Sequence, residues 1–231
     1  MRRIITHREI ILASALALVA CVAVVGQQQQ QGKNFAQAQQ ENAKKLRGYS
    51  WKSRTEVSKG GETKSTQIYL VRYDAEGNVQ QTLIGGTSAQ IPTHGLRGLI
   101  AKKKKEDFLE LLDGLKATAK SYASLPPEKM QRFMATASVT PEKTAQKSLI
   151  RMQGRDVLQP GDTMTVWLDA ATRRQRRVEI QTTFDNKPLR IVSEFQDLTD
   201  GPTHVARTVV DYPSRELTVT TDNFDYVTAR Q

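Results

Sequence analysis

Alternating hydrophobic and polar residues dominate the chain from Tyr49 onward, and they predict β-strands. Tyr49, Trp51 and Val57 share one face with two hydroxyl residues, while charged and polar residues occupy the other face. This period of two is typical of a strand that is buried on one side. Turns rich in Gly and Asp follow. The pattern predicts a three-stranded antiparallel meander over residues 49–57, 66–73 and 79–84.

The middle of the chain changes to the helical period. Apolar residues between Phe108 and Tyr122 recur every three or four positions and form one continuous stripe. A second, shorter stripe begins at Met130, after a pair of prolines. The two stripes predict two helices that pack against the sheet. The lysine run at 102–105 is expected to open the first helix, where positive charge opposes the helix dipole.

The rest of the chain returns to the strand period, with turns rich in Asp, Gly and Pro. Val178 and Ile180 face one way, while Arg177 and Glu179 face the other. Strands, then helices, then strands, with no βαβ alternation, predict an α+β fold with helices on one face of an antiparallel sheet. The six further strands are expected at residues 148–157, 163–168, 177–184, 189–195, 204–210 and 216–226.

The N-terminus has a different character, because an uncharged apolar segment of about 17 residues, Ile10–Gly26, follows a basic start. It is interpreted as a cleaved export signal or as a retained anchor with its positive flank in the cytoplasm. A third interpretation is lipidation at Cys21, because Leu18–Cys21 resembles the bacterial lipobox. The apolar run continues past Cys21, which disfavours lipidation. All three interpretations predict an exported protein of the periplasm or cell envelope. If the segment is a retained anchor, residues 10–26 hold the protein in the inner membrane.

Glutamines dominate the next segment, and so polar a tract forms a flexible tether. Good helix formers follow in residues 35–46. The remaining length suits one domain. The predicted organisation is a signal peptide or membrane anchor at 1–26, a Gln-rich linker at 27–34 and a single domain at 35–231.

The net charge of +10 narrows the choice of partners. Without residues 1–26, which hold three arginines and one glutamate, it is about +8. Two basic clusters could contact anionic lipid headgroups or acidic polysaccharide, or could simply be solvated. No nucleic-acid-binding motif is present, so no nucleic-acid partner is predicted. The clusters are Lys102, Lys103, Lys104 and Lys105, and Arg173, Arg174, Arg176 and Arg177.

Candidate chemistry is sparse. The chain contains no Gly-x-Ser-x-Gly, His-Glu-x-x-His, Walker or Cys-x-x-Cys motif. His94 and His204 have no consistent carboxylate neighbour in the sequence. Asp156, Asp162 and Asp169 flank turns, where a carboxylate usually accepts hydrogen bonds from turn amides. The sequence therefore predicts no catalytic residue, no metal site and no cofactor, and a protein that is not an enzyme.

The C-terminal half contains a familiar hairpin, in the segments VWLDAAT (166–172), RVEI (177–180) and FDNKPL (184–189). It resembles the W-L-D-x-x-T … R-x-E … D-x-x-G hairpin of the LolA/LolB-like superfamily of outer-membrane lipoprotein sorting, mainly over 148–226. The resemblance implies an antiparallel β half-barrel of about nine strands with two or three helices on its concave face. The superfamily's early basic-proline strand pair has no clear counterpart here, and the role of its cavity-closing arginine is not transferred to Arg54.

The resemblance also implies a hydrophobic cavity that holds acyl chains of a lipid or lipoprotein, without enzymatic reaction. The first alternative is a membrane-anchored envelope sensor or adaptor that uses the same fold to bind a protein or an acidic glycan. A hydrolase would need a buried carboxylate or histidine beside a cleft. The residues predicted to line the lipid cavity are Trp51, Ile68, Leu70, Met130, Met134 and Trp167.

Overall fold

The computed structural model describes residues 37–88, 95–144, 148–199 and 201–229, and for 95–102 the description is confined to the backbone. The predicted export segment, the Gln-rich linker, Cys21 and His94 lie outside the described residues. The expectations for them stay predictions.

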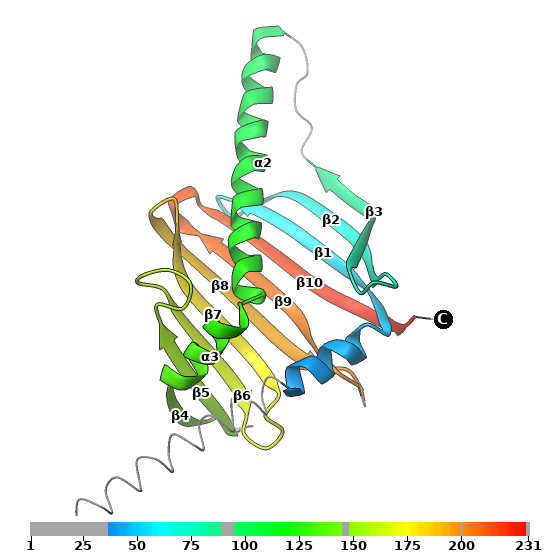
Figure 1. The fold of residues 1–231 in the computed structure, drawn as a ribbon. Helices are drawn as coiled ribbons and strands as arrows, with labels where there is room; N and C mark the ends of the chain where they lie inside the picture. The colour runs from blue at the N-terminus through cyan, green and yellow to red at the C-terminus, as the bar shows by residue number, and fades with distance from the viewer. Residues whose placement is uncertain (1–36, 89–94, 145–147, 200, 230–231) are drawn as a thin grey trace, which may run out of the picture.

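Ten antiparallel strands form one open sheet, in the order β3-β2-β1-β10-β9-β8-β7-β6-β5-β4 (Figure 1). With its helices, the sheet confirms the predicted α+β half-barrel. The tenth strand, β4 (Ser138–Lys143), was not predicted, because its residues are all exposed and show no apolar alternation. The other strands are β1 (Tyr49–Lys59), β2 (Glu62–Tyr73), β3 (Val79–Ser88), β5 (Ser148–Arg155), β6 (Thr163–Asp169), β7 (Gln175–Phe184), β8 (Lys187–Asp197), β9 (Thr203–Tyr212) and β10 (Leu217–Thr228).

The predicted helices are α2 (Gly95–Ala123) and α3 (Pro127–Thr136), and a short helix spans residues 37–46. The expectation that the lysine run opens the first helix was wrong, because the lysines lie about two turns inside α2. Lys104 and Lys105 precede Phe108 by four and three residues, so they continue its face of the helix. The buried stripe therefore becomes charged there, and the N-terminal half of α2 projects beyond the sheet (Figure 1).

The concave face of the sheet is defined by a row of apolar side chains in register across neighbouring strands. Opposed residues of an antiparallel pair point to the same face. The row joins Val57, Val219, Val210, Ile191, Ile180 and Met164, from β1 to β6. Leu112 and Leu115 of α2 and Phe133 of α3 pack against it in one buried cluster.

Two glycines allow the helices to approach the sheet closely. A Cβ atom on Gly154 of β5 would lie 2.7 Å from the Phe133 ring of α3, and one on Gly114 of α2 would lie 2.5 Å from the Phe184 ring. Either distance is far below van der Waals contact. Over β5 to β8 the helices are therefore packed directly onto the strands.

The C-terminal end of α2 is fixed by a buried hydrogen-bond network. The Tyr122 hydroxyl donates to Asp162 Oδ2 at 2.6 Å and lies 2.8 Å from Thr182 Oγ1 of β7. Burial and the bond to Asp162 raise the pKa of Tyr122. Burial also acts to raise the pKa of Asp162, but hydrogen bonds from Tyr122 and from three backbone amides outweigh it, so this pKa is lowered. The carboxylate stays ionised and ties α2 to the sheet.

The prediction that the turn-flanking carboxylates accept turn amides is confirmed. Asp162 accepts the amides of Val157, Leu158 and Gln159 at 2.6 to 3.0 Å. Asp156 accepts the amide of Gly161, and Asp169 accepts those of Ala171 and Thr172.

Candidate functional site

The concave face has two halves. The half over β5 to β9 carries α2 and α3 and is buried; we call it the covered half. The half formed by β1, β2 and β3 is the open half. Register places Trp51, Tyr69 and Leu83 on its concave side. Leu83 is 58% exposed and Val79 50%, so these two apolar side chains face solvent, whereas Val71 and Val57 on the same side of β2 and β1 are buried.

Stacked aromatic rings form the floor at one end of the open half. Trp51 lies parallel to Tyr226, with centroids 5.4 Å apart, and 5.7 Å from Tyr73. The His204 ring lies 4.2 Å from Tyr226. Burial raises the pKa of Tyr226. Such offset and tilted pairs stabilise a fixed arrangement of rings. The end of the open half nearest the short helix is thus apolar and preorganised.

His204 belongs to this stack and not to a catalytic arrangement. It is the one histidine in the described part of the chain, and it is 7% exposed. Burial lowers its pKa, while the backbone of Gln196 and the charge of Asp197 act in the opposite direction. The ring is therefore neutral near pH 7 and packs as an aromatic group.

A row of hydroxyl side chains crosses the sheet from the covered half into the open half. Ser193, Thr208, Thr221 and Thr55 follow one another in register on the concave side of β8, β9, β10 and β1. Ser193 and Thr208 are 3.0 Å apart, and Thr55 and Thr221 are 3.2 Å apart. Each hydroxyl can still accept a further hydrogen bond. An apolar molecule in the open half would therefore meet polar groups at one side.

The six predicted cavity residues do not lie together. Met130 and Met134 are half-buried on α3 and pack against the core of the covered half. Trp51 lies in the aromatic stack of the open half. Register places Ile68, Leu70 and Trp167 on the convex face, because each is opposed to residues of that face. Their hydrophobic character misled the prediction, since a strand's face is set by register and not by composition.

Trp167 illustrates what holds an aromatic residue on the convex face. Its indole N–H donates to Glu142 Oε2 at 3.1 Å. The Arg177 guanidinium lies 5.4 Å from its ring, and that of Arg151 lies 6.0 Å away. Two cations at these distances form cation–π contacts. The convex face continues as a charged row in register through Arg151, Trp167, Arg177, Glu194, Arg207, Asp222 and Arg54.

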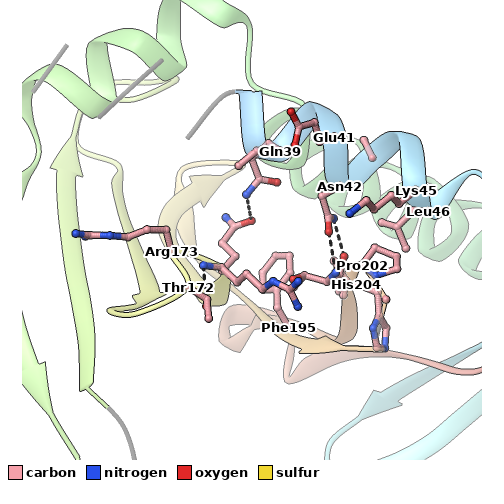
Figure 2. A pocket seen from close by; sticks show the side chains of 17 residues that line it. Gln39, Glu41, Asn42, Lys45, Leu46, Thr172, Arg173, Phe195, Pro202 and His204 are labelled. Atoms are coloured by element: carbon pink, nitrogen blue, oxygen red, sulfur yellow. Dashed lines mark hydrogen bonds between the residues drawn. The ribbon is translucent and has the colours of Figure 1, made fainter. Parts of the chain in front are cut away.

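A pocket of about 340 Å³ lies between the short helix at 37–46 and the starts of β7 and β9 (Figure 2). Gln39 donates to Gln175 Oε1 at 3.1 Å across it. Asn42 donates to the Thr203 carbonyl and accepts the Thr203 amide, both at 2.7 Å. None of the six predicted cavity residues lines this pocket. The hydrogen bonds identify it as the joint between the short helix and the sheet.

The predicted arginine cluster is largely neutralised by acidic neighbours. Arg174 and Arg176 both pair with Asp197, at 3.2 and 2.8 Å. Arg177 pairs with Glu179 at 2.9 Å. Arg173 extends away from the pocket in Figure 2. In the lysine cluster, Lys103, Lys104 and Lys105 are exposed on the projecting part of α2, while the Lys102 side chain is outside the described residues.

Sequence reasoning missed Leu83 and Val79 of the open half and the Tyr122–Asp162 bond. The strand predicted over 79–84 contains both apolar residues, but no local signal pairs Tyr122 with Asp162, which lies 40 positions away. In the described ranges, no group of three or more His, Cys, Asp or Glu residues is placed to hold a metal ion. Within the same ranges, no helix has the length and hydropathy needed to cross a membrane.

No protein-family profile and no curated protein matches the chain. Three solved structures resemble it at 10% sequence identity, with 92% of each covered. One is a LolA superfamily protein from Nitrosomonas europaea, with a TM-score of 0.38 over 83% of this chain. The others are a DUF1329 family protein from Desulfovibrio piger (0.41, 88%) and a domain from Vibrio parahaemolyticus described as an outer membrane lipoprotein-sorting protein (0.40, 85%).

Proposed function

We propose that this chain is a non-enzymatic cell-envelope protein that binds an acyl chain of a lipid or lipoprotein in the open half of the concave face. The observation that carries the proposal is the solvent-facing Leu83 and Val79 beside a rigid aromatic floor. Burying exposed apolar surface is the main favourable contribution to such binding.

The layout of the open half also suits an amphipathic ligand. The acyl chain would lie along the apolar side chains of β1 to β3. Its carboxylate or ester oxygen would reach the hydroxyl row that begins at Thr55. This placement replaces the cavity expected between the helices and the whole sheet, because the covered half is filled by Leu112, Leu115 and Phe133. Residues 35–231 would form the binding domain.

Two leucines on opposite faces provide a matched test. Leu83 lies on the concave face of β3 and Leu70 on the convex face of the neighbouring β2, with exposures of 58% and 39%. A fluorescent fatty acid and a triacylated lipopeptide would be titrated separately into residues 33–231. We expect saturable binding that Leu83→Glu weakens at least tenfold and Leu70→Glu leaves nearly unchanged. No saturable binding of either ligand, or equal loss in both variants, would contradict the proposal.

The proposed location rests on the N-terminal sequence and is tested separately. Mass spectrometry of the protein recovered from cells distinguishes the three interpretations of residues 1–26. An intact start indicates an anchor, removal of about 26 residues indicates a cleaved signal, and an acylated Cys21 at the new N-terminus indicates a lipoprotein. Recovery of the intact chain from the cytosol would contradict the envelope location.

A further inference from the structure

The two edges of the sheet differ in how they are protected. β3 and β4 each have one hydrogen-bonded neighbour, β2 and β5. An edge strand presents a row of backbone N–H and C=O groups that can pair with another strand. Soluble proteins commonly block such edges with proline, with charged side chains or by keeping the strand short.

β4 has all three protections. It spans six residues, Ser138–Lys143. Pro141 lies within it and has no N–H group to donate. Glu142 and Lys143 follow directly, and Glu142 is also held by the indole of Trp167 at 3.1 Å. A strand from another molecule that paired with β4 would therefore lack the hydrogen bond at Pro141 and would lie beside the charged side chains of Glu142 and Lys143.

β3 has none of these three protections, although a β-bulge at Ile84 shifts the register of its pairing with β2. It spans ten residues, Val79–Ser88, with the sequence VQQTLIGGTS, which contains neither proline nor a charged residue. Its central residues Leu83 and Ile84 are 58% and 51% exposed. A chain with 25% charged residues thus leaves its longest unpaired edge without a single charge. This combination is typical of a strand that pairs with another strand.

We propose that the β3 edge pairs with the β3 edge of a second copy of this chain, antiparallel and about a two-fold axis near Leu83. An identical edge is uncharged as well, so the strands can meet although each chain carries a net charge of +10. The axis would place the two Leu83 side chains opposite each other, where apolar pairs stabilise a sheet. The contact continues the antiparallel order of the sheet.

The blocked β4 edge limits this assembly to two copies. Pairing of β3 with β4 of another copy would repeat without closure and form a filament. Pro141 and the charges beside it oppose that contact. Pairing of β3 with β3 uses the same surface on both copies and is closed after one contact.

Cysteine cross-linking of the full chain in membranes tests the contact. The native Cys21 is replaced by Ser, and Leu83→Cys is compared with Val139→Cys, an equally apolar position on β4 that is 48% exposed. Opposed Cα atoms of antiparallel strands lie about 4.5 to 5.5 Å apart, within the range of a disulfide. Mild oxidation should convert most Leu83→Cys chains to a species of twice 25.9 kDa and leave Val139→Cys monomeric.

A charge on the β3 edge should abolish the product. Adding Ile84→Lys, or independently Thr82→Lys, to the Leu83→Cys chain should reduce the cross-linked fraction at least tenfold. Two exposed positions are used so that a folding defect in one does not decide the result. A monomeric Leu83→Cys chain, equal cross-linking through Val139→Cys, or no effect of either lysine would overturn the proposal. The cross-linked fraction is measured without any acyl ligand, so this experiment tests the dimer separately from acyl-chain binding.

Discussion

The covered and open halves of the concave face use similar strands but differ in what lies above them. In the covered half, Ile180 and Ile191 lie beneath α2 and α3 and are almost fully buried. In the open half, Leu83 has the same kind of position on its strand and faces solvent. The comparison teaches that alternation identifies which side of a strand is apolar, whereas burial depends on where the helices lie.

The position of α2 is set by two features of its own sequence. Its apolar stripe ends at Phe108, because the positions that continue it hold Lys104 and Lys105. Its C-terminal end is held by the bond between Tyr122 and Asp162. The C-terminal half of α2 therefore covers the buried row of the sheet, and at Phe108 it reaches Lys59 at the end of β1. Four experiments test the differences between these regions, from the largest expected effect to the smallest.

Removing the charge that holds α2 should have the largest effect. Both carboxylate oxygens of Asp162 accept hydrogen bonds, from the Tyr122 hydroxyl and from backbone amides. Asp162→Asn replaces one of these oxygens by an N–H₂ group, which cannot accept, so the donors that face it lose their partner. We expect a loss of about 4 kcal/mol in the free energy of unfolding, measured by urea denaturation. Asp156→Asn in the same loop is the control and should cost at most about 0.5 kcal/mol, since the amide oxygen can still accept. Equal losses would show that Asp162 acts only as a turn residue.

Truncating one leucine in each half should separate the halves directly. Leu189 of the covered half is 2% exposed, and Leu83 of the open half is 58% exposed. Leu189→Ala should cost about 3 kcal/mol of unfolding free energy because it leaves a cavity. Leu83→Ala should cost at most about 0.5 kcal/mol. A cost at Leu83 close to that at Leu189 would mean that the open half is covered in solution.

The aromatic floor of the open half should contribute less to the free energy of unfolding than the buried leucine. Tyr226→Leu keeps an apolar side chain but removes the stack with Trp51, so we expect a loss of about 1 kcal/mol. The near-ultraviolet circular dichroism of Trp51 should weaken with it. Phe224→Leu, on the convex side of the same strand, should leave that signal unchanged. An unchanged signal in Tyr226→Leu would exclude a rigid floor.

The convex face should show the smallest effect on unfolding free energy, and this effect depends on pH. A hydrogen bond from Arg190 lowers the pKa of Glu179 to about 2, with burial acting in the opposite direction and Arg177 adding to the decrease. A lowered carboxyl pKa contributes stability above the ordinary value of 4.5, which is lost as the pH falls through about 2. Glu179→Gln should therefore reduce the loss of stability between pH 4.5 and 2. Glu194→Gln, beside a longer ion pair of 3.8 Å, is the control and should change this slope less.

Much of the fold could be predicted from particular residues. The alternation of Val178 and Ile180 with Arg177 and Glu179 predicted a strand and its buried side, and both are confirmed. β4 could not be predicted, because it is exposed on both faces and includes Pro141. The start of α2 was also missed, since the four lysines at 102–105 interrupt the apolar stripe before Phe108.

The candidate site was less predictable than the fold. Trp167 and Leu70 were expected in a cavity on the strength of their size and hydrophobicity, yet register turns them to the convex face. Leu83 was passed over, although it is the most exposed leucine of the open half. A shift of one residue in pairing reverses the side of every residue in a strand, and no local pattern fixes that pairing.

The sequence alone determined the strand and helix periods, the turns between them, and the apolar N-terminal segment that predicts export. These properties depend on residues within a few positions of one another. Only the tertiary structure decided which half of the sheet the helices cover, which edge is left unprotected, and where each aromatic residue lies. These depend on contacts between distant residues, such as Tyr122 with Asp162 and Trp51 with Tyr226. The free energy of such contacts arises from packing and burial that exist only once the chain is folded.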